Sequence, residues 1–252
     1  MSTMANSNHL PSATAQDQHF ATTNWSIVVA ASGDDSPHAA VALSALCERY
    51  WYPLYAFVRR RGYGSADAQD LTQAFFAMVL EKNSFSVADP DRGRFRSFLL
   101  GALSNFLMNY WREGCTQKRG GNRPLLSLNF QHAEERYIAE PSHQLTAERI
   151  YDRKWALTLL ETAMGKLSEE YTQAGKDVLF DGIKSRLGGD SPSISIRHIA
   201  AELQMTEGAV KVAVHRLRRR YRDLLRNEIA DTVANPADVD DELRTLFDLL
   251  GN

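Results

Sequence analysis

The sequence predicts an all-α protein made of two small helical domains joined by a flexible linker, the second of which contains a helix-turn-helix. Apolar side chains recur at helical spacing along nearly the whole chain, and the sequence shows no alternating runs of β-branched residues. Glycine and proline fall mainly between these periodic segments, where they end helices. A length of 252 residues suits two domains of this size.

The same patterns place the boundaries between the expected parts. The N-terminal stretch lacks the basic start and the apolar core of a signal peptide, so it is expected to be a disordered leader. The segment after the first domain is basic and rich in turn-forming residues, which predicts a linker. The expected parts are the leader (1–19), the first helical domain (20–113), the linker (114–145), the second helical domain (146–230) and an acidic amphipathic C-terminal helix (231–252).

The composition is that of a globular protein, with 44% hydrophobic and 24% charged residues. No apolar run approaches the length of a membrane span, so we expect no contact with a membrane. Cys47 and Cys115 lie far apart and suit a reducing cytoplasm, which is the expected compartment. The net charge of −2 hides an asymmetry, because basic residues cluster in segments such as 211–226 while acids cluster in 238–242.

The first domain is expected to begin with a long helix. Pro37 follows Ser36, and proline is favoured at the first position of a helix. Pro53 lies further along the same segment and is expected to kink it. Residues 62–64, Gly-Tyr-Gly, predict a break, after which Ser65 begins the next helix.

The helix expected over residues 65–81 is apolar on two faces. Leu71, Phe75 and Met78 form one stripe, whereas Phe76 and Leu80 lie on the other side of the wheel. A helix of this kind is either buried in a core or shared with a partner, and the composition alone favours neither alternative.

A second helix with two apolar faces is expected around residues 95–112. Arg92, Arg94, Arg96 and Arg112 flank it, so aromatic rings and guanidinium groups alternate along this segment. Single-stranded nucleic acid is bound in this way, because bases stack on rings while phosphates meet arginines. Aromatic residues at helical spacing are nevertheless core residues more often than not.

The second domain begins near Thr146, and its first helix carries an apolar stripe. That stripe consists of Ile150, Leu157, Leu160, Met164 and Leu167. The helix-turn-helix occupies residues 195–225, with a short turn at residues 204–205 and Thr206 as the N-cap of its second helix.

The second helix of this unit separates apolar from basic residues. Its apolar stripe consists of Val210, Val214, Leu217, Tyr221 and Leu224. Its basic arc, roughly 130° away, consists of Lys211, His215, Arg218, Arg219 and Arg222. This arrangement is typical of a recognition helix in the major groove of DNA, and a solvated charged face is the alternative.

Asn235 and Pro236 are expected to begin a last amphipathic helix over residues 236–250. Its apolar side comprises Val239, Leu243, Leu246, Phe247 and Leu250. Acid is concentrated in its first turns, where it complements the helix dipole. Two alternatives stay open: the helix packs on the second domain, which we favour, or it also covers the basic helix at residues 211–222.

Taken together, these segments resemble the extracytoplasmic-function sigma factors, the smallest members of the main bacterial sigma superfamily, which have only regions 2 and 4. DAQDLTQAFF at residues 67–76, RFRSFLLGALSNFLMNYWRE, a basic linker and TEGAVKVAVHRLRRR follow in the order and spacing of that family. The resemblance covers about residues 20–230. The chain departs from the family at Leu167-Ser168, at the long loop of residues 188–193 and in its acidic tail.

The resemblance implies three binding surfaces. The surface implied for the coiled coil of the polymerase β′ subunit comprises Asp67, Asp70, Leu71, Gln73 and Phe76. The surface implied for the −10 promoter element comprises Arg94, Arg96, Asn105, Trp111 and Arg112, with Ser104 where the family usually has an arginine. The surface implied for the −35 element comprises Thr206, Lys211, Ala213, His215, Arg216, Arg218, Arg219 and Arg222.

The function implied by this resemblance is that of a bacterial sigma factor, which recruits core RNA polymerase to promoter DNA and catalyses no reaction itself. We expect no catalytic, cofactor-binding or metal-binding residues, because no motif for them occurs in the sequence. An anti-sigma protein as a further partner is left open. The alternatives are a helix-turn-helix regulator that does not bind polymerase, and a nucleic-acid enzyme, which would need clustered carboxylates or a metal set.

Overall fold

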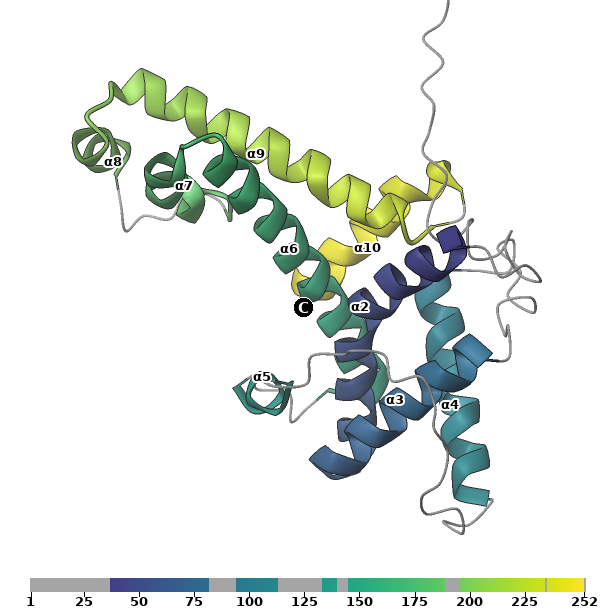
Figure 1. Ribbon diagram of the computed structural model, residues 1–252. Helices are drawn as coiled ribbons and strands as arrows, with labels where there is room; N and C mark the ends of the chain where they lie inside the picture. The colour runs from purple at the N-terminus through teal and green to yellow at the C-terminus, as the bar shows by residue number, and fades with distance from the viewer. Residues whose placement is uncertain are drawn as a thin grey trace, which may run out of the picture.

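The computed structural model describes residues 37–81, 94–112, 133–139, 145–188, 195–233 and 235–251. Every element within these ranges is a helix, which confirms the predicted all-α class (Figure 1). No helix in the described ranges is both long and apolar enough to cross a membrane. The predicted leader lies outside the described residues.

The helices of the predicted first domain begin and end largely where expected. Helix α2 runs over Pro37–Arg60 and continues through the buried Pro53, and α3 runs over Ser65–Glu81. Between them Gly62 has a φ of +96°, a left-handed conformation that costs a glycine little. Helix α4 spans Phe95–Arg112.

A short helix lies within the segment predicted as a linker. Helix α5 spans Ala133–Ala139 and is attached to α2 by side-chain contacts. Glu134 accepts hydrogen bonds from the Tyr55 hydroxyl at 2.6 Å and from Arg59 at 2.6 and 2.9 Å. Arg59 also lies over the ring of Tyr137, 5.0 Å from its centroid. This part of the predicted linker is therefore held by tertiary contacts.

The long helix α6, Ala147–Gln173, joins the two predicted domains. Near its N-terminus Glu148 pairs with Arg61 at the end of α2, and near its C-terminus Glu170 pairs with Arg220 of α9. Figure 1 shows α2 crossing the lower part of α6 while α9 lies along its upper part. The buried side chains form one contiguous cluster from α2 to α10, so the described residues do not divide into two separate cores.

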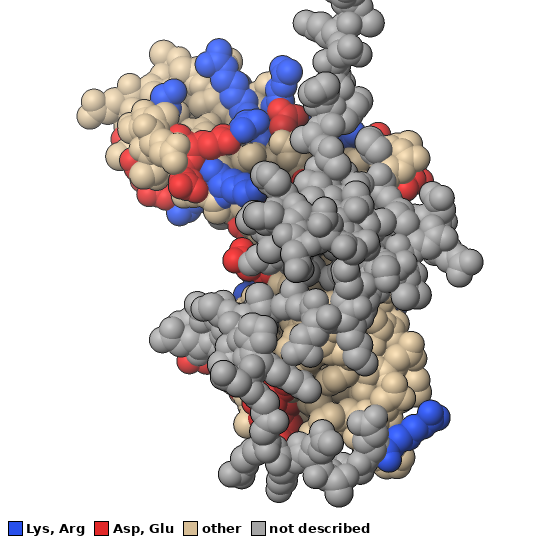
Figure 2. Space-filling model, turned by 45° about the vertical axis from the view of Figure 1, so that its right-hand side comes forward, with Lys and Arg blue, Asp and Glu red and all other residues tan. Residues whose placement is uncertain are grey.

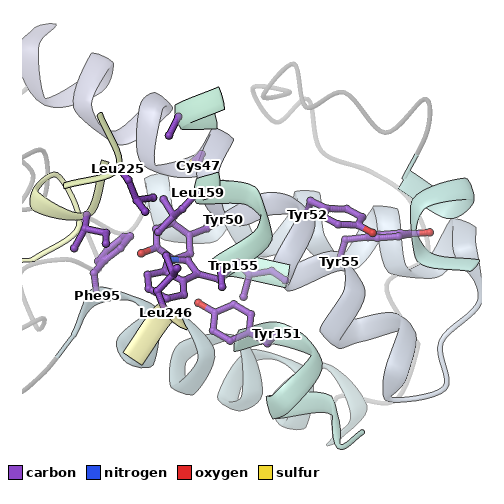
Figure 3. Close-up of a cluster of buried hydrophobic side chains, with 14 of the residues drawn as sticks. Cys47, Tyr50, Tyr52, Tyr55, Phe95, Tyr151, Trp155, Leu159, Leu225 and Leu246 are labelled. Carbon is purple, nitrogen blue, oxygen red and sulfur yellow. The ribbon is translucent and has the colours of Figure 1, made fainter. Parts of the chain in front are cut away.

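Side chains from α2, α4, α6, α9 and α10 meet at the centre of this core (Figure 3). Tyr50 of α2 contacts Phe95 of α4 edge to face, with ring centroids 5.2 Å apart. Trp155 of α6, Leu225 of α9 and Leu246 of α10 are buried beside them. The burial of such large apolar side chains is the main stabilising contribution to this fold.

The remaining helices complete the second half of the chain. They are α7 over Asp177–Ile183, a 3-10 turn over Lys184–Arg186, α8 over Ile196–Glu202, α9 over Glu207–Ala230, a 3-10 turn over Pro236–Asp238 and α10 over Val239–Gly251.

Helix α10 packs into the molecule, as the favoured alternative predicted. Val239 and Leu246 are buried, and Leu243 and Leu250 are half-buried. The expectation that Phe247 also packs is wrong, because its side chain is 55% exposed. One acidic residue of this helix also contributes to packing, since the buried Glu242 forms ion pairs with Arg94 and Arg96 at the start of α4.

Candidate nucleic-acid interface

Helices α8 and α9 and the turn between them form a capped unit. The Ser195 hydroxyl accepts a hydrogen bond from the backbone N–H of His198 at 3.1 Å, and the Thr206 hydroxyl accepts one from Ala209 at 3.2 Å. These caps satisfy N–H groups that have no partner within the helix. Gln204 makes the turn at a φ of +52°. The predicted N-cap and turn are therefore confirmed.

The inner side of this unit is fixed against the rest of the molecule. Val210, Val214 and Leu217 of α9 are buried, as the predicted apolar stripe required. Helix α7 approaches closely, since a Cβ added at Gly182 would lie 3.1 Å from the side chain of Leu203. These contacts hold α9 in a fixed orientation against the core.

The outer side of α9 is basic and exposed. Figure 2 shows lysine and arginine side chains projecting from the upper part of the molecule, at the height of α9. No described carboxylate pairs with the exposed basic side chains of this surface. We call it the basic face of α9; its members are Lys211, His215, Arg216, Arg219 and Arg222.

Two residues expected on this face lie elsewhere. Ala213 is half-buried against the core. Arg218 is half-buried, and its Nε donates a hydrogen bond to the carbonyl of Arg186 at 2.9 Å. The expectation that these two residues contact DNA is therefore corrected. The Ala213 side chain points toward the core, and the Arg218 side chain is hydrogen-bonded to the turn after α7. Thr206 is exposed, but its hydroxyl serves as the N-cap.

Helix α10 does not cover the basic face of α9. Asp240 pairs with Arg226, beyond the C-terminal end of that face, and the five basic side chains stay exposed. Figure 1 shows α10 beneath the C-terminal part of α9, at the opposite end from α8. The alternative in which the acidic tail covers residues 211–222 is therefore not the arrangement observed.

A second exposed surface lies on the C-terminal half of α4. Met108 is 52% exposed, Tyr110 43% and Trp111 80%, and the neighbouring Asn105 and Arg112 are exposed as well. Beside them is a groove of about 480 Å³. It is lined by Phe57, Arg61, Tyr63, Ser104, Leu107, Met108, Trp111 and Arg112.

The groove combines a mostly apolar wall with two arginines. A planar ring could stack on Trp111 while an anionic group meets Arg61 or Arg112. Sequence reasoning predicted Asn105, Trp111 and Arg112 for this surface and missed Arg61 and Tyr63. Those two residues lie in the turn that follows α2, and only the fold brings them beside α4.

Arg94 and Arg96, expected at the same surface, belong instead to a charged cluster at the other end of α4. Glu242 of α10 pairs with Arg94 at 2.9 Å and with Arg96 at 2.8 Å. Arg96 also pairs with Asp152 of α6 at 2.5 Å and lies over the ring of Trp155, 4.7 Å from its centroid. The expected role in nucleic-acid binding is therefore wrong for the buried Arg96.

Arg94 is half-exposed, but its guanidinium pairs with Glu242. The expectation that Arg94 binds the −10 element is therefore corrected. Burial raises the pKa values of Asp152 and Glu242, while the arginines oppose that rise. The side chains of this cluster therefore act chiefly to join α4 to α6 and α10.

The surface of α3 also differs from expectation. Leu71 and Phe76 are buried, with exposed fractions of 4% and 1%. Phe76 thus lies in the core and is not part of an exposed second apolar face. Only Asp67, Asp70 and the half-buried Gln73 of the expected polymerase-binding set reach the surface.

No group of three or more histidine, cysteine, aspartate or glutamate side chains within the described ranges could hold a metal ion. The chain matches no protein-family model, no curated protein and no solved structure. The interpretation of these surfaces therefore rests on their own geometry and chemistry.

Proposed function

We propose that this protein is a sigma factor, which binds core RNA polymerase and directs it to promoter DNA. The observation that carries the proposal is the basic face of α9, which is exposed and has no carboxylate partner among the described residues, on a helix whose opposite side is buried in the core. An α-helix of this kind fits the major groove of DNA, where its cations neutralise phosphates. In this proposal α9 reads the −35 element.

The groove beside α4 supports a second part of the same proposal. Trp111 and Tyr110 offer rings for base stacking, and Arg112 and Arg61 offer cations for the backbone. Melting of the −10 element exposes single-stranded bases, which this surface suits. The proposed contact residues are Asn105, Trp111 and Arg112, together with Arg61 and Tyr63.

The proposal is tested first by DNA binding. Lys211→Ala and Arg219→Ala are expected to weaken binding to all duplexes and to reduce the slope of log affinity against log salt by about 0.9 per lost phosphate contact. Arg220→Ala is the matched control, because Arg220 lies on the same helix but pairs with Glu170. Equal affinities and slopes for all four proteins would overturn the role of this face.

The proposed binding to RNA polymerase is tested by co-elution with purified core enzyme and by run-off transcription from genomic fragments. The wild-type protein is expected to co-elute and to direct initiation from defined start sites. Asp67→Ala and Asp70→Ala, both at exposed positions of α3, are expected to weaken co-elution without lowering the melting temperature. Failure of the wild-type protein to bind core enzyme would overturn this part.

The second candidate function is that of a DNA-binding regulator that never contacts polymerase. The burial of Phe76 favours it, because Leu71 and Phe76, the apolar residues of the set expected for polymerase binding, do not reach the surface of α3. This candidate predicts a dimer and a palindromic site. Sequence-specific binding of a dimer to such a site, without co-elution with core enzyme, would select it.

A further inference from the structure

Two residues on the exposed side of α9 have no role in the stability of the helix. Gly208 and Val212 lie one turn apart, so they are neighbours on the same face. Glycine weakens a helix through backbone entropy, and valine weakens it because its branched side chain loses rotamer freedom. Both residues therefore occupy positions where a better helix former could stand.

The fold does not require either residue. A Cβ added at Gly208 would meet only the Thr206 hydroxyl oxygen, at 4.0 Å, and the glycine lies within regular helix. Val212 is 50% exposed and is absent from the buried cluster. A small residue followed by an exposed apolar one thus forms a strip that is free to contact another molecule closely.

Basic residues surround this strip. Lys211, His215 and Arg219 follow on the same exposed side of α9, with the acidic Glu207 at its start. A binding partner must therefore carry negative charge around a central apolar group. Duplex DNA has this chemistry in its major groove, where the C5-methyl group of thymine is the apolar feature among the base edges and phosphates line both walls.

We propose that Val212 contacts the methyl group of one thymine in the major groove and that Gly208 allows the backbone of α9 to approach the bases there. Val212 is then a specificity-determining residue, whereas the surrounding cations supply affinity that is independent of sequence. The inference rests on the proposed function of α9 in binding DNA, and it adds the base that this helix prefers.

The test uses thymine itself as the probe. A preferred duplex is selected with the full-length protein from a pool of random sequence, and each thymine in it is then replaced in turn by deoxyuridine. Deoxyuridine lacks only the methyl group and keeps all hydrogen-bonding groups. The wild-type protein is expected to lose about fourfold in affinity at one position, which corresponds to one buried methyl-sized group.

The variant Val212→Ala is expected to bind thymine and deoxyuridine equally at that position, while its salt dependence stays that of the wild type. Gly208→Ala is expected to raise the melting temperature and still weaken binding to the selected duplex several-fold. Gly165→Ala is the matched control, since Gly165 lies in α6 rather than in α9 and has no atom within 4 Å of an added Cβ.

The outcomes separate this inference from the proposed function. If the protein binds the duplex in a salt-dependent way but loses no affinity at any deoxyuridine position, the proposed role of Val212 is wrong. The proposed function of α9 in DNA binding would then still stand. Unchanged affinity of both Gly208→Ala and Val212→Ala for the selected duplex would also overturn the inference. Absence of binding to any duplex would overturn it together with the proposed function.

Discussion

Individual residues of this protein show how far helical periodicity predicts the role of a side chain. The predicted apolar stripe of α9 is confirmed, since Val210, Val214 and Leu217 are buried. Their spacing places all three side chains on one face of an α-helix. Arg96 was predicted wrongly. Its flanking aromatic residues suggested nucleic acid, but its partners Asp152 and Glu242 lie far away in the sequence.

Phe76 shows the same limit for an apolar residue. The wheel correctly separated it from Leu71 and Phe75, yet all three side chains are buried. A helix with two apolar faces is covered on both when neighbouring helices flank it, and the sequence of α3 alone does not contain those neighbours.

Replacement of Phe76 by alanine tests this location. Because the ring is fully buried, Phe76→Ala is expected to lower the free energy of unfolding by about 3–5 kcal/mol in urea denaturation. Asp70→Ala, on the exposed side of the same helix, is the control and should stay within about 0.5 kcal/mol of the wild type. If Phe76→Ala is as stable as the wild type, the Phe76 ring is not buried in the core.

The charged cluster at the start of α4 predicts a dependence of stability on pH. Burial raises the pKa of Glu242 above its ordinary value of 4.5, while Arg96, Arg94 and Asp152 face it. The folded state then binds the proton more tightly than the unfolded state does. The contribution of Glu242 to stability is therefore lost as pH rises from about 4.5 through the raised pKa.

The comparison of wild type with Glu242→Gln isolates this contribution. The difference in unfolding free energy, wild type minus variant, is expected to fall as pH rises through that window. Glu170→Gln is the opposite control, because Arg220 lowers the pKa of Glu170, so its contribution is lost as pH falls. A difference for Glu242→Gln that grows with pH would contradict the dominance of burial.

Among whole elements, the capped helices were the most predictable and α5 was the least. Thr206 begins α9 and Pro37 begins α2 where local chemistry requires it. Helix α5 is only 7 residues long, too short to be stable by itself, and it persists through the contacts of Glu134 with Arg59 and Tyr55. Contacts of this kind leave no signal in local sequence.

The C-terminal helix makes a testable contribution to stability. Truncation after Val233 removes the buried side chains of Val239 and Leu246 and is expected to cost more than about 3 kcal/mol of unfolding free energy. Because α10 leaves the basic face of α9 exposed, DNA affinity should not increase. Phe247→Ser is the control, since that ring is 55% exposed and its loss should be nearly neutral.

A gain in DNA affinity on truncation, largest at low salt, would contradict this expectation. It would mean that the tail reaches the basic face in solution, because attraction between opposite charges is strongest where screening is weak.

At the scale of the whole molecule, the sequence predicted two domains because a basic, glycine-rich segment separates two helical blocks. The structure joins those blocks through α6. The stripe predicted for that helix includes Leu157, Leu160 and Met164, which are only half-buried, whereas Tyr151, Trp155 and Leu159 carry the shared core. Ile150 and Leu167 of the same stripe are buried, so the prediction is confirmed in part. Which other face of a long helix is buried depends on the helices that pack against it, and periodicity alone does not contain them.

A shared core predicts that the two halves unfold together. Leu159 is completely buried where α2, α6 and α9 meet, so unfolding of either half would expose it. We expect one transition in urea, with coincident midpoints by tryptophan fluorescence and by far-ultraviolet circular dichroism. Leu159→Ala should lower both midpoints together, by an amount that corresponds to about 2–5 kcal/mol.

Val178→Ala is the control for this experiment, because Val178 is 75% exposed on α7 and its loss should leave both midpoints unchanged. Two separate transitions would show that the halves fold independently, with α6 belonging to only one of them. In that case Leu159→Ala would shift a single transition, and the transition that moves would identify the half whose stability depends on this helix.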